Sequence, residues 1–267
     1  MIKLVLVDAD GTLFSAETGI PNSARKAIEE AKLAGIRFAL CTGRPVGGFA
    51  LGWARWLDPQ GLHVFANGAA VIDAEGLPRY SEPLSNSAWK NIVHLARAHG
   101  IAVDAVTADG GRFHERGLKP PDLERHEKFI GVYSQERNLD EVMQVVHVWY
   151  VAGQQKWDTA REDIMNLPET RWLVYRAPNA VVAGTARIGI TKAYGLSLLA
   201  SHHGIDISKI AMVGDGDNDL EAIASAGLGI AMGNAEDQVK QAADVVVGSL
   251  DQDGLAEAIS FILENRR

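Results

Sequence analysis

Short apolar runs of strand type alternate with an amphipathic helical stretch in the first third of the chain. The runs 2–7, 37–41 and 63–66 are apolar, and each is followed by a turn that contains a glycine. Residues 22–34 have helical periodicity and stop before Gly35. This order of elements predicts right-handed βαβ units in a parallel sheet.

The last third of the chain repeats this rhythm. Its hydrophobic pattern predicts helices at 192–203, 219–226 and 255–264 and strands at 209–213, 228–232 and 244–247. The two ends of the chain are therefore expected to build one α/β unit with a Rossmann-like parallel sheet. We assign residues 1–82 and 186–267 to this core.

The middle of the chain has a different pattern. Its strand-like segments 101–107, 142–152 and 171–176 are longer and more alternating, and helices are expected to begin near Ser87 and Trp157. Four tryptophans, at positions 89, 149, 157 and 172, fall here and are expected in a hydrophobic core. The pattern predicts an inserted α+β domain at 83–185 with an antiparallel sheet.

Composition limits the classes of partner. The chain has 267 residues, 47% hydrophobic and 22% charged, with a formal net charge of −8, and this is typical of a soluble globular protein. The acidic balance disfavours nucleic acid and anionic membranes as partners. A single cysteine, no long apolar run and no signal-peptide pattern at the start lead us to expect a cytoplasmic protein without intrachain disulfides.

Polar residues gather where the predicted core strands end. Asp8 and Asp10 follow the first strand, Thr42 and Gly43 follow the second, and the run Gly-Asp-Gly-Asp-Asn-Asp follows strand 209–213. Lys192 begins a predicted helix. The carboxyl ends of parallel strands share one edge of a sheet, so these groups are expected to converge although they are far apart in sequence. An Asp-x-Asp pair alone would fit an acidic turn equally well.

Convergence of several carboxylates needs a cation, because like charges raise one another's pKa. Magnesium suits such a site, since it prefers oxygen ligands and keeps positions for water and phosphate oxygens. Lys192 would supply a fixed positive charge to a phosphate, and the Thr42 hydroxyl would donate a hydrogen bond to it. These parts are typical of phosphoryl transfer.

The motifs Asp-Ala-Asp-Gly-Thr-Leu at 8–13, Thr-Gly-Arg-Pro at 42–45, Thr-Lys at 191–192 and Gly-Asp-Gly-Asp-Asn-Asp at 214–219 occur in this order. Together they resemble the signature motifs of the haloacid dehalogenase superfamily. The segments 66–69, 189–196 and 231–235 narrow the resemblance to the Cof-like (type IIB) phosphatases. The middle insert has the position and size of the cap of that subfamily, but it carries no sharp motif.

The resemblance implies a Mg²⁺-dependent phosphatase that acts on small phosphorylated metabolites, with sugar phosphates as the expected class. It implies that Asp8 is the nucleophile and forms an aspartyl-phosphate, and that Asp10 is the general acid and base. The metal would be held by Asp8, by the backbone carbonyl of Asp10 and by Asp215. The remaining roles fall to Thr42, Gly43, Lys192 and Asn218 at the phosphate, and to Asp219, which would hold Lys192 or a metal-bound water.

Several alternatives remain open from the sequence. A phosphomutase or phosphotransferase would use the same core. A silent sugar-phosphate-binding protein would keep the fold without turnover, but the intact pair Asp8 and Asp10 argues against it. A signalling receiver would share the acids, the threonine and the lysine, but the long insert and the second acidic cluster far along the chain disfavour it.

Arg44 and Asn67 are as compatible with loop structure as with a site, and Asn234 is expected to be structural. The basic segment 110–119 is expected to be a solvated loop, or else a loop that contacts the substrate. Oligomeric state is not readable from the sequence.

Overall fold

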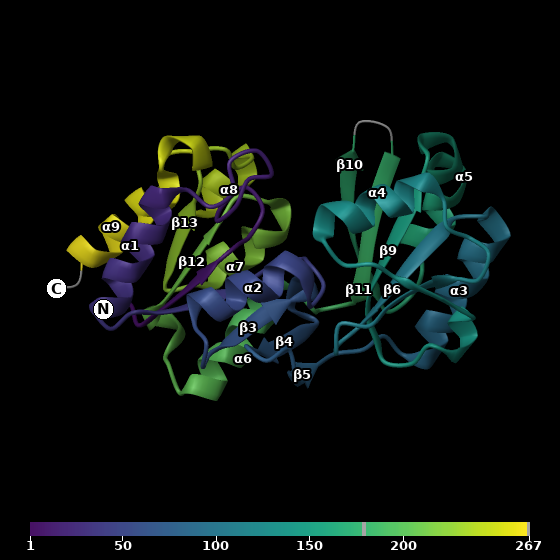
Figure 1. The fold of residues 1–267 in the computed structure, drawn as a ribbon, viewed down its shortest axis with the longest axis horizontal. Coiled ribbons are helices and arrows are strands. Elements are labelled where there is room, and N and C mark those ends of the chain that lie inside the picture. The colour runs from purple at the N-terminus through teal and green to yellow at the C-terminus, as the bar shows by residue number, and fades with distance from the viewer. Residues whose placement is uncertain (178–179, 266–267) are drawn as a thin grey trace.

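The computed structural model describes residues 1–177 and 180–265, and it consists of two lobes that lie side by side (Figure 1). We call the lobe that holds both ends of the chain the core, and the lobe from α3 to β11 the cap. The elements of the core are β1 (Leu4–Val7), α1 (Asn22–Leu33), β2 (Arg37–Leu40), α2 (Gly48–Leu57), β3 (Leu62–Phe65), β4 (Ala70–Asp73), β5 (Pro78–Ser81), α6 (Lys192–His203), β12 (Ile210–Gly214), α7 (Leu220–Ser225), β13 (Leu228–Ala231), α8 (Asp237–Ala242), β14 (Val245–Val246) and α9 (Gly254–Glu264).

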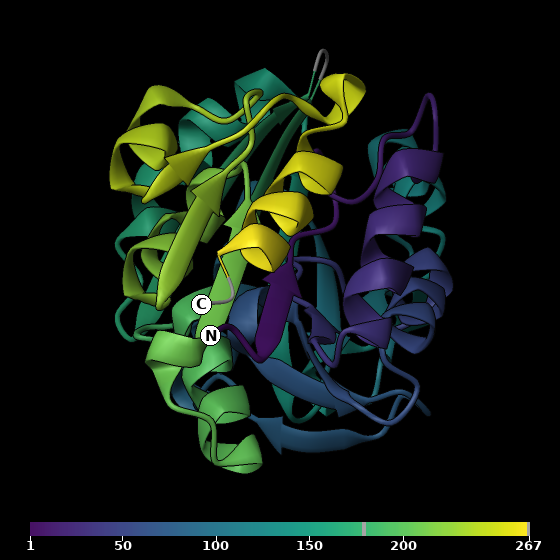
Figure 2. The ribbon, with the colours of Figure 1, turned by 90° about the vertical axis from the view of Figure 1, so that its left-hand side faces the viewer.

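The core is a parallel sheet between two helical layers, in the order β14-β13-β12-β1-β2. Alternation along β1 explains the layers, because Val5 and Val7 point to one face and Leu4 and Leu6 to the other. Helices α1, α2 and α9 bury their apolar sides on the first face, and α6, α7 and α8 on the second. Figure 2 shows α1 and α9 side by side in front of the strands. The predicted α/β class is confirmed.

The third predicted strand does not extend this sheet as expected. Residues 62–65 form β3, which belongs to an antiparallel sheet of order β3-β4-β5. A single parallel bridge between Cys41 and Val64 connects it to the end of β2. The hairpin partner β4 bonds the backbone of β3 along its length, so a longer parallel pairing with β2 was not needed.

The cap has a mixed sheet of order β10-β11-β9-β6-β7-β8. Most neighbouring strands are antiparallel, as predicted, but β7 and β8 run parallel. Their parallel direction follows from α4, which crosses between them. The elements are α3 (Asn86–His99), β6 (Ala102–Thr107), β7 (Arg112–Glu115), α4 (Pro121–Ile130), β8 (Gln135–Arg137), β9 (Val145–Ala152), α5 (Gln154–Met165), β10 (Thr170–Ala177) and β11 (Ala180–Arg187).

The two faces of the cap sheet differ. Helices α3 and α5 cover the outer face, where Trp89 and Trp157 are buried as predicted. The other face carries α4 and lies toward the core (Figure 1), and Trp149 on this face belongs to the same hydrophobic cluster as the core helices. The cap is therefore packed against the core by apolar contacts. Within the described residues, none of the helices has the length and apolar character needed to cross a membrane.

The basic segment 110–119 is a loop only in part, since residues 116–119 lie outside regular structure and are mostly exposed. Residues 112–115 form β7, and Arg112 is 2% exposed and pairs with the buried carboxylate of Asp104 on β6. His114 is also buried and bonds Ser134. The positive charges of this segment led us to expect exposed side chains. A buried arginine is tolerated, however, when it pairs with an equally buried carboxylate. These side chains support the cap sheet.

The fold is sensitive to acid because of three histidines, of which His63 and His147 are buried and His126 is partly buried. Burial lowers the pKa of His63 to about 4 and that of His126 to about 4. Burial, and then the neighbouring His126, lowers the pKa of His147 to about 3. In the unfolded chain a histidine has a pKa near ~6.5, so unfolding takes up protons below that pH. Their neutral forms thus contribute stability above about pH 6.5, and this stability is lost as the pH falls toward 4.

We expect the free energy of unfolding to fall between pH 6.5 and pH 4, with up to about 1.4 kcal/mol per pH unit from each histidine. Urea denaturation at pH 7, 6 and 5 measures this slope. Comparison with His147→Leu separates one histidine from the carboxylates, because the variant lacks one proton-binding group and should have a shallower slope. Parallel pH curves for the two proteins would contradict this account of His147.

Candidate active site

Three core strands end at the same level and bring the predicted residues together. Val7 at the end of β1 lies opposite Val213 of β12 on one side and Leu40 of β2 on the other. The backbone N–H of Asp8 donates to Val213 O at 2.9 Å and continues this ladder by one residue. Side chains that follow these strands therefore share one edge of the sheet, as the sequence predicted.

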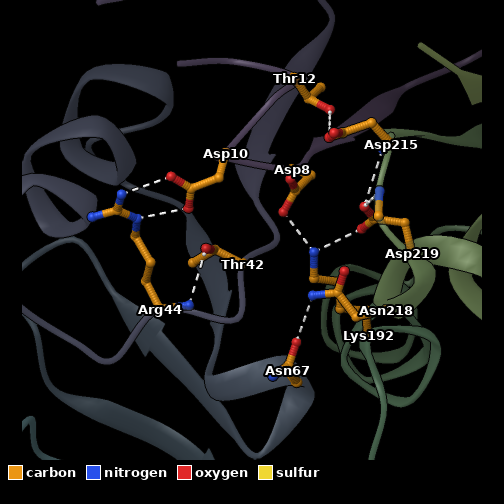
Figure 3. Close-up of polar contacts among 11 residues, drawn as sticks. Asp8, Asp10, Thr12, Thr42, Arg44, Asn67, Lys192, Asp215, Asn218 and Asp219 are labelled. Carbon is orange, nitrogen blue, oxygen red and sulfur yellow. Dashed lines mark hydrogen bonds and ion pairs between the residues drawn. The ribbon is translucent and has the colours of Figure 1, made fainter. Parts of the chain in front are cut away.

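Lys192 lies at the centre of this edge. Thr191 caps α6, since its Oγ1 accepts a hydrogen bond from Tyr194 N, and this makes Lys192 the first residue of the helix. Its buried Nζ donates to Asp8 Oδ1 at 2.5 Å and to Asp219 Oδ1 at 2.7 Å (Figure 3). A lysine opposes the positive end of a helix dipole, and these two carboxylates offset that cost.

The charges around Lys192 do not balance. Burial alone would lower the pKa of Lys192, but Asp219 and Asp8 outweigh it and raise that pKa well above its usual value, so the lysine is cationic. Burial, followed by the charge of Asp219, raises the pKa of Asp8 well above its usual range although Lys192 opposes this. One ammonium group thus serves more carboxylates than it can neutralise.

A cluster of acids next to Lys192 has the chemistry of a metal site. Carboxylate oxygens of Asp8, Asp215 and Asp219 lie within 4.8 Å of one another. Thr12 Oγ1 donates to Asp215 Oδ1 at 2.7 Å, and Asn234 Nδ2 donates to Oδ2 at 2.9 Å, so these two residues fix the Asp215 carboxylate. Burial raises the pKa of Asp215 to about 6; Thr12 opposes the rise and Asp219 adds to it. A divalent cation would stabilise all three ionised acids, so the donor set fits one.

Asp219 differs from the other two acids of the cluster. Its Oδ1 binds Lys192, and its Oδ2 accepts from the backbone N–H groups of Asp215 and Gly216 at 3.1 and 3.0 Å. Asp219 is also fully buried, whereas Asp215 is only partly buried. The contacts of Asp219 orient Lys192 and the loop after β12, and the roles of Asp8 and Asp215 as metal ligands stay predictions.

A glycine makes the close approach of Asp215 possible. Gly11 has φ +85° and a Cβ atom there would lie 2.2 Å from Asp215 Oδ2. Any other residue would have a strained backbone and would displace this carboxylate. Gly11 is thus needed because its missing side chain leaves room for Asp215. The sequence alone did not reveal this contact.

The carboxylate of Asp10 points away from the acid cluster. Arg44 binds it with two hydrogen bonds, from Nε to Oδ2 at 2.7 Å and from Nη2 to Oδ1 at 2.6 Å (Figure 3). The Asp10 side chain is 41% exposed, so it is accessible from solvent. The pairing of Asp10 with Arg44 was missed in the sequence, where Arg44 fitted a loop role equally well.

The other residues predicted to contact a phosphate, Thr42, Gly43 and Asn218, all lie against Asn67. Thr42 is buried and its Oγ1 accepts from the backbone N–H of Arg44 at 3.1 Å, which leaves the hydroxyl hydrogen for a ligand. Gly43 is packed against Asn67, whose Oδ1 would lie 2.8 Å from an added Cβ. Asn67 in turn accepts from Asn218 Nδ2 at 2.8 Å. The structure thus brings Asn218 and Asn67 together, and the roles of Thr42, Gly43 and Asn218 at a phosphate stay predictions.

Comparison with known proteins gives consistent results. Residues 5–259 match the profile of a family described as haloacid dehalogenase-like hydrolase. The chain is 28% identical to 5-amino-6-(5-phospho-D-ribitylamino)uracil phosphatase YcsE of Bacillus subtilis, over 97% of this chain and 94% of the relative. It is 27% identical to the chloroplastic endoribonuclease YBEY of Arabidopsis thaliana over 96% of this chain, but it spans only 45% of the length of that relative.

Solved structures agree over nearly the whole chain. A haloacid dehalogenase-like hydrolase from Bacteroides thetaiotaomicron superimposes with a TM-score of 0.84 at 29% identity, covering 98% of this chain and 100% of that chain. The sugar phosphatase BT4131, described as subclass IIB, superimposes with a TM-score of 0.81 at 25% identity, covering 97% and 98%. Both lobes are therefore shared with these structures.

Proposed function

Because the chain belongs to the haloacid dehalogenase-like hydrolase family, we propose a specific reaction for it. It is a Cof-like phosphatase that acts on small phosphorylated metabolites. The proposed reaction is the hydrolysis of sugar phosphates with Mg²⁺ through an aspartyl-phosphate on Asp8. The observation that carries this proposal is the contact of Asp8 with Lys192 next to the acids Asp215 and Asp219. The proposed nucleophile, a buried ammonium group and a cluster of acids lie together at one edge of the sheet.

The first step would transfer the phosphoryl group to Asp8. Lys192 binds Oδ1 of Asp8, so we assign Oδ2 as the oxygen that attacks phosphorus while the bond to the leaving oxygen breaks. Asp10 would donate its proton to that leaving oxygen and release the alcohol. Lys192 and Thr42 would hold the phosphoryl oxygens and stabilise the charge that spreads over them.

The second step would return Asp8 to its free state. A water molecule would attack the phosphorus of the aspartyl-phosphate, Asp10 would take a proton from that water, and the bond between phosphorus and the Asp8 oxygen would break to release inorganic phosphate. Asp10 thus ends this step protonated and ready to donate again. Its partial exposure beside the site suits a residue that meets both the alcohol and the water.

Mg²⁺ is the cation that we propose for the acid cluster. Asp8, Asp215 and the backbone carbonyl of Asp10 would hold it, and when bound it would neutralise charge on the phosphate. The charge imbalance around Lys192 and the raised pKa of Asp215, about 6, support a dication at this place. Oxygen-only donors favour Mg²⁺ over metals that prefer sulfur or imidazole.

Sugar phosphates are proposed as the substrate class because a structural neighbour is described as a sugar phosphatase. The relative YcsE is named for a phosphate ester of a ribityl chain, which is also a polyol. The cap would cover the leaving group and select it. We also propose that the cap extends from residue 83 to 185, since Glu82 accepts from Arg187 Nη1 at 2.8 Å and this contact joins the two crossings between the lobes.

A metabolite panel tests the function and the metal together. We expect the purified protein to release inorganic phosphate from 4-nitrophenyl phosphate and from one or more sugar phosphates with Mg²⁺. The chelator EDTA should abolish release, and excess Mg²⁺ should restore it. Absence of phosphate release from every ester of the panel would contradict the hydrolase proposal, and transfer of the phosphoryl group to a second sugar would identify a phosphotransferase instead.

Metal binding can be measured without turnover. Mg²⁺ at about a hundredfold excess over its Kd should stabilise the fold by about 2.7 kcal/mol, and Asp215→Asn should lose most of this gain because one charged ligand is removed. Thermal denaturation of both proteins with and without Mg²⁺ reads this out. An equal gain in wild type and variant would place the metal elsewhere.

A further inference from the structure

Arg44 holds both oxygens of the Asp10 carboxylate. Its Nε and Nη2 atoms donate at 2.7 and 2.6 Å, and its own side chain is only 5% exposed. A bidentate arginine–carboxylate pair fixes the rotation of the carboxylate as well as its position, which a single hydrogen bond does not. The position of Asp10 is thus set by a residue from a different loop of the core.

The remaining nitrogen of this guanidinium reaches the cap. Arg44 Nη1 donates to Phe129 O at 3.3 Å and lies 3.5 Å from Ile130 O. These carbonyls belong to the last two residues of α4, and the helix is capped by Gly131 in the left-handed conformation. The final carbonyls of a helix have no partner within it and carry partial negative charge, so they attract a cation. One side chain therefore contacts Asp10 and the end of a cap helix at the same time.

Aromatic rings surround the guanidinium. Its Cζ lies 4.9 Å from the ring centre of Phe129, 5.2 Å from that of Trp53 and 6.0 Å from that of Phe14. Trp53 comes from α2, Phe14 from the segment after β1, and Phe129 from the cap. The rings shield the guanidinium of this side chain, which is 5% exposed, and add cation–π attraction to it.

We propose that Arg44 is a positioning residue that fixes the Asp10 carboxylate and makes this position depend on the cap lying against the core. With α4 in place, the guanidinium is held from both sides. When the cap moves away, Arg44 loses the two carbonyls and the ring of Phe129, and Asp10 gains rotational freedom. This inference rests on the proposed function, in which Asp10 carries the proton. The contact with Arg44 would align Asp10 for proton transfer only when the cap lies against the core.

The first test replaces Arg44 in the full chain with Mg²⁺ present. Arg44→Gln is expected to lower kcat about 100-fold on phenyl phosphate, with little change in KM. The loss should be smaller on 4-nitrophenyl phosphate, because its better leaving group needs less help from a proton donor. Arg44→Lys should not restore activity, since an ammonium cannot bind both carboxylate oxygens. The backbone N–H of Arg44 keeps its bond to Thr42 in both variants.

Arg55→Gln is the matched control. Arg55 lies on α2 and also donates to a main-chain oxygen, Ala74 O at 2.6 Å, but that contact is on the β4–β5 side and does not involve Asp10. Its kcat should stay close to that of wild type. Wild-type kcat in Arg44→Gln would overturn the inference, whereas an inactive wild-type protein would instead overturn the proposed function.

The second test asks whether the cap acts through Arg44. Phe129 is 55% exposed, so Phe129→Ala should fold, and its backbone carbonyl remains. Loss of the ring is expected to lower kcat about 3- to 5-fold in the wild-type background and to have no effect in Arg44→Gln. Independent, additive losses in the double variant would overturn the coupling, and this holds even if Arg44→Gln loses stability.

Discussion

Asp8→Asn is expected to reduce phosphate release by more than about 10⁴-fold. An amide nitrogen or oxygen does not attack phosphorus as a carboxylate does, so no aspartyl-phosphate forms. Steady-state assays with 4-nitrophenyl phosphate and Mg²⁺ measure the loss. Mass spectrometry of acid-quenched wild-type protein should show a phosphorylated peptide that contains residue 8, and the variant should lack it.

The fold of this variant is expected to survive. Burial and the neighbouring Asp219 raise the pKa of Asp8, so the ionised carboxylate is disfavoured where it stands, and a neutral amide can still accept from Lys192. Asp217→Asn is the matched control, because Asp217 is an exposed acid of the nearby loop that binds Gln238 at 2.6 Å. Wild-type turnover in Asp8→Asn would remove Asp8 as the nucleophile, and equal losses in both variants would indicate a general charge effect.

Lys192→Met should have the largest effect on stability. Its buried ammonium contacts Asp8 and Asp219 at 2.5 and 2.7 Å, and methionine leaves two buried carboxylates without that cation. Removing one partner of a buried ion pair costs about 3–5 kcal/mol. Urea denaturation of the metal-free protein should show this loss, and phosphate release should fall as well because the fixed charge for the phosphate is gone.

A double variant separates charge from packing. Lys192→Met/Asp219→Asn should recover part of the lost stability, since it removes one of the uncompensated carboxylates while the amide oxygen can still accept from the N–H groups of Asp215 and Gly216. Activity should not recover with it. A double variant that is less stable than Lys192→Met would show that the cost comes from lost packing and not from charge.

Much of the core was predictable from local pattern. The strand before Asp8, the helix at 192–203 and the strand before Asp215 occur where the sequence placed them, because buried parallel strands are continuous apolar runs and the helix carries its own stop at Gly204. Polar residues directly follow these strands in the sequence, which also indicated that they share one edge of the sheet. The acids of Asp8 and Asp215 do meet there.

Other features depended on partners that the sequence does not reveal. The segment 110–119 seemed to be a basic loop, yet Asp104 on the neighbouring strand pairs with Arg112 and buries it. The third strand seemed to belong to the main sheet, yet it pairs with β4, the next strand along the chain. In each case pairing with the neighbouring strand of a hairpin outweighed the preference of the segment itself, because burial and hydrogen-bond satisfaction depend on the partner strand.

The sequence by itself determined the order of the motifs, and with it the family and the residues expected at the phosphate. Only the tertiary structure decided how the two acids of the first motif are used: Asp8 faces Lys192 within the acid cluster, whereas Asp10 is turned to Arg44 and, through it, to the cap. The physical reason is direction in space. Residues 8 and 10 are only two positions apart in the chain, but the direction of each carboxylate depends on the cationic side chains of Lys192 and Arg44, which are far away in sequence.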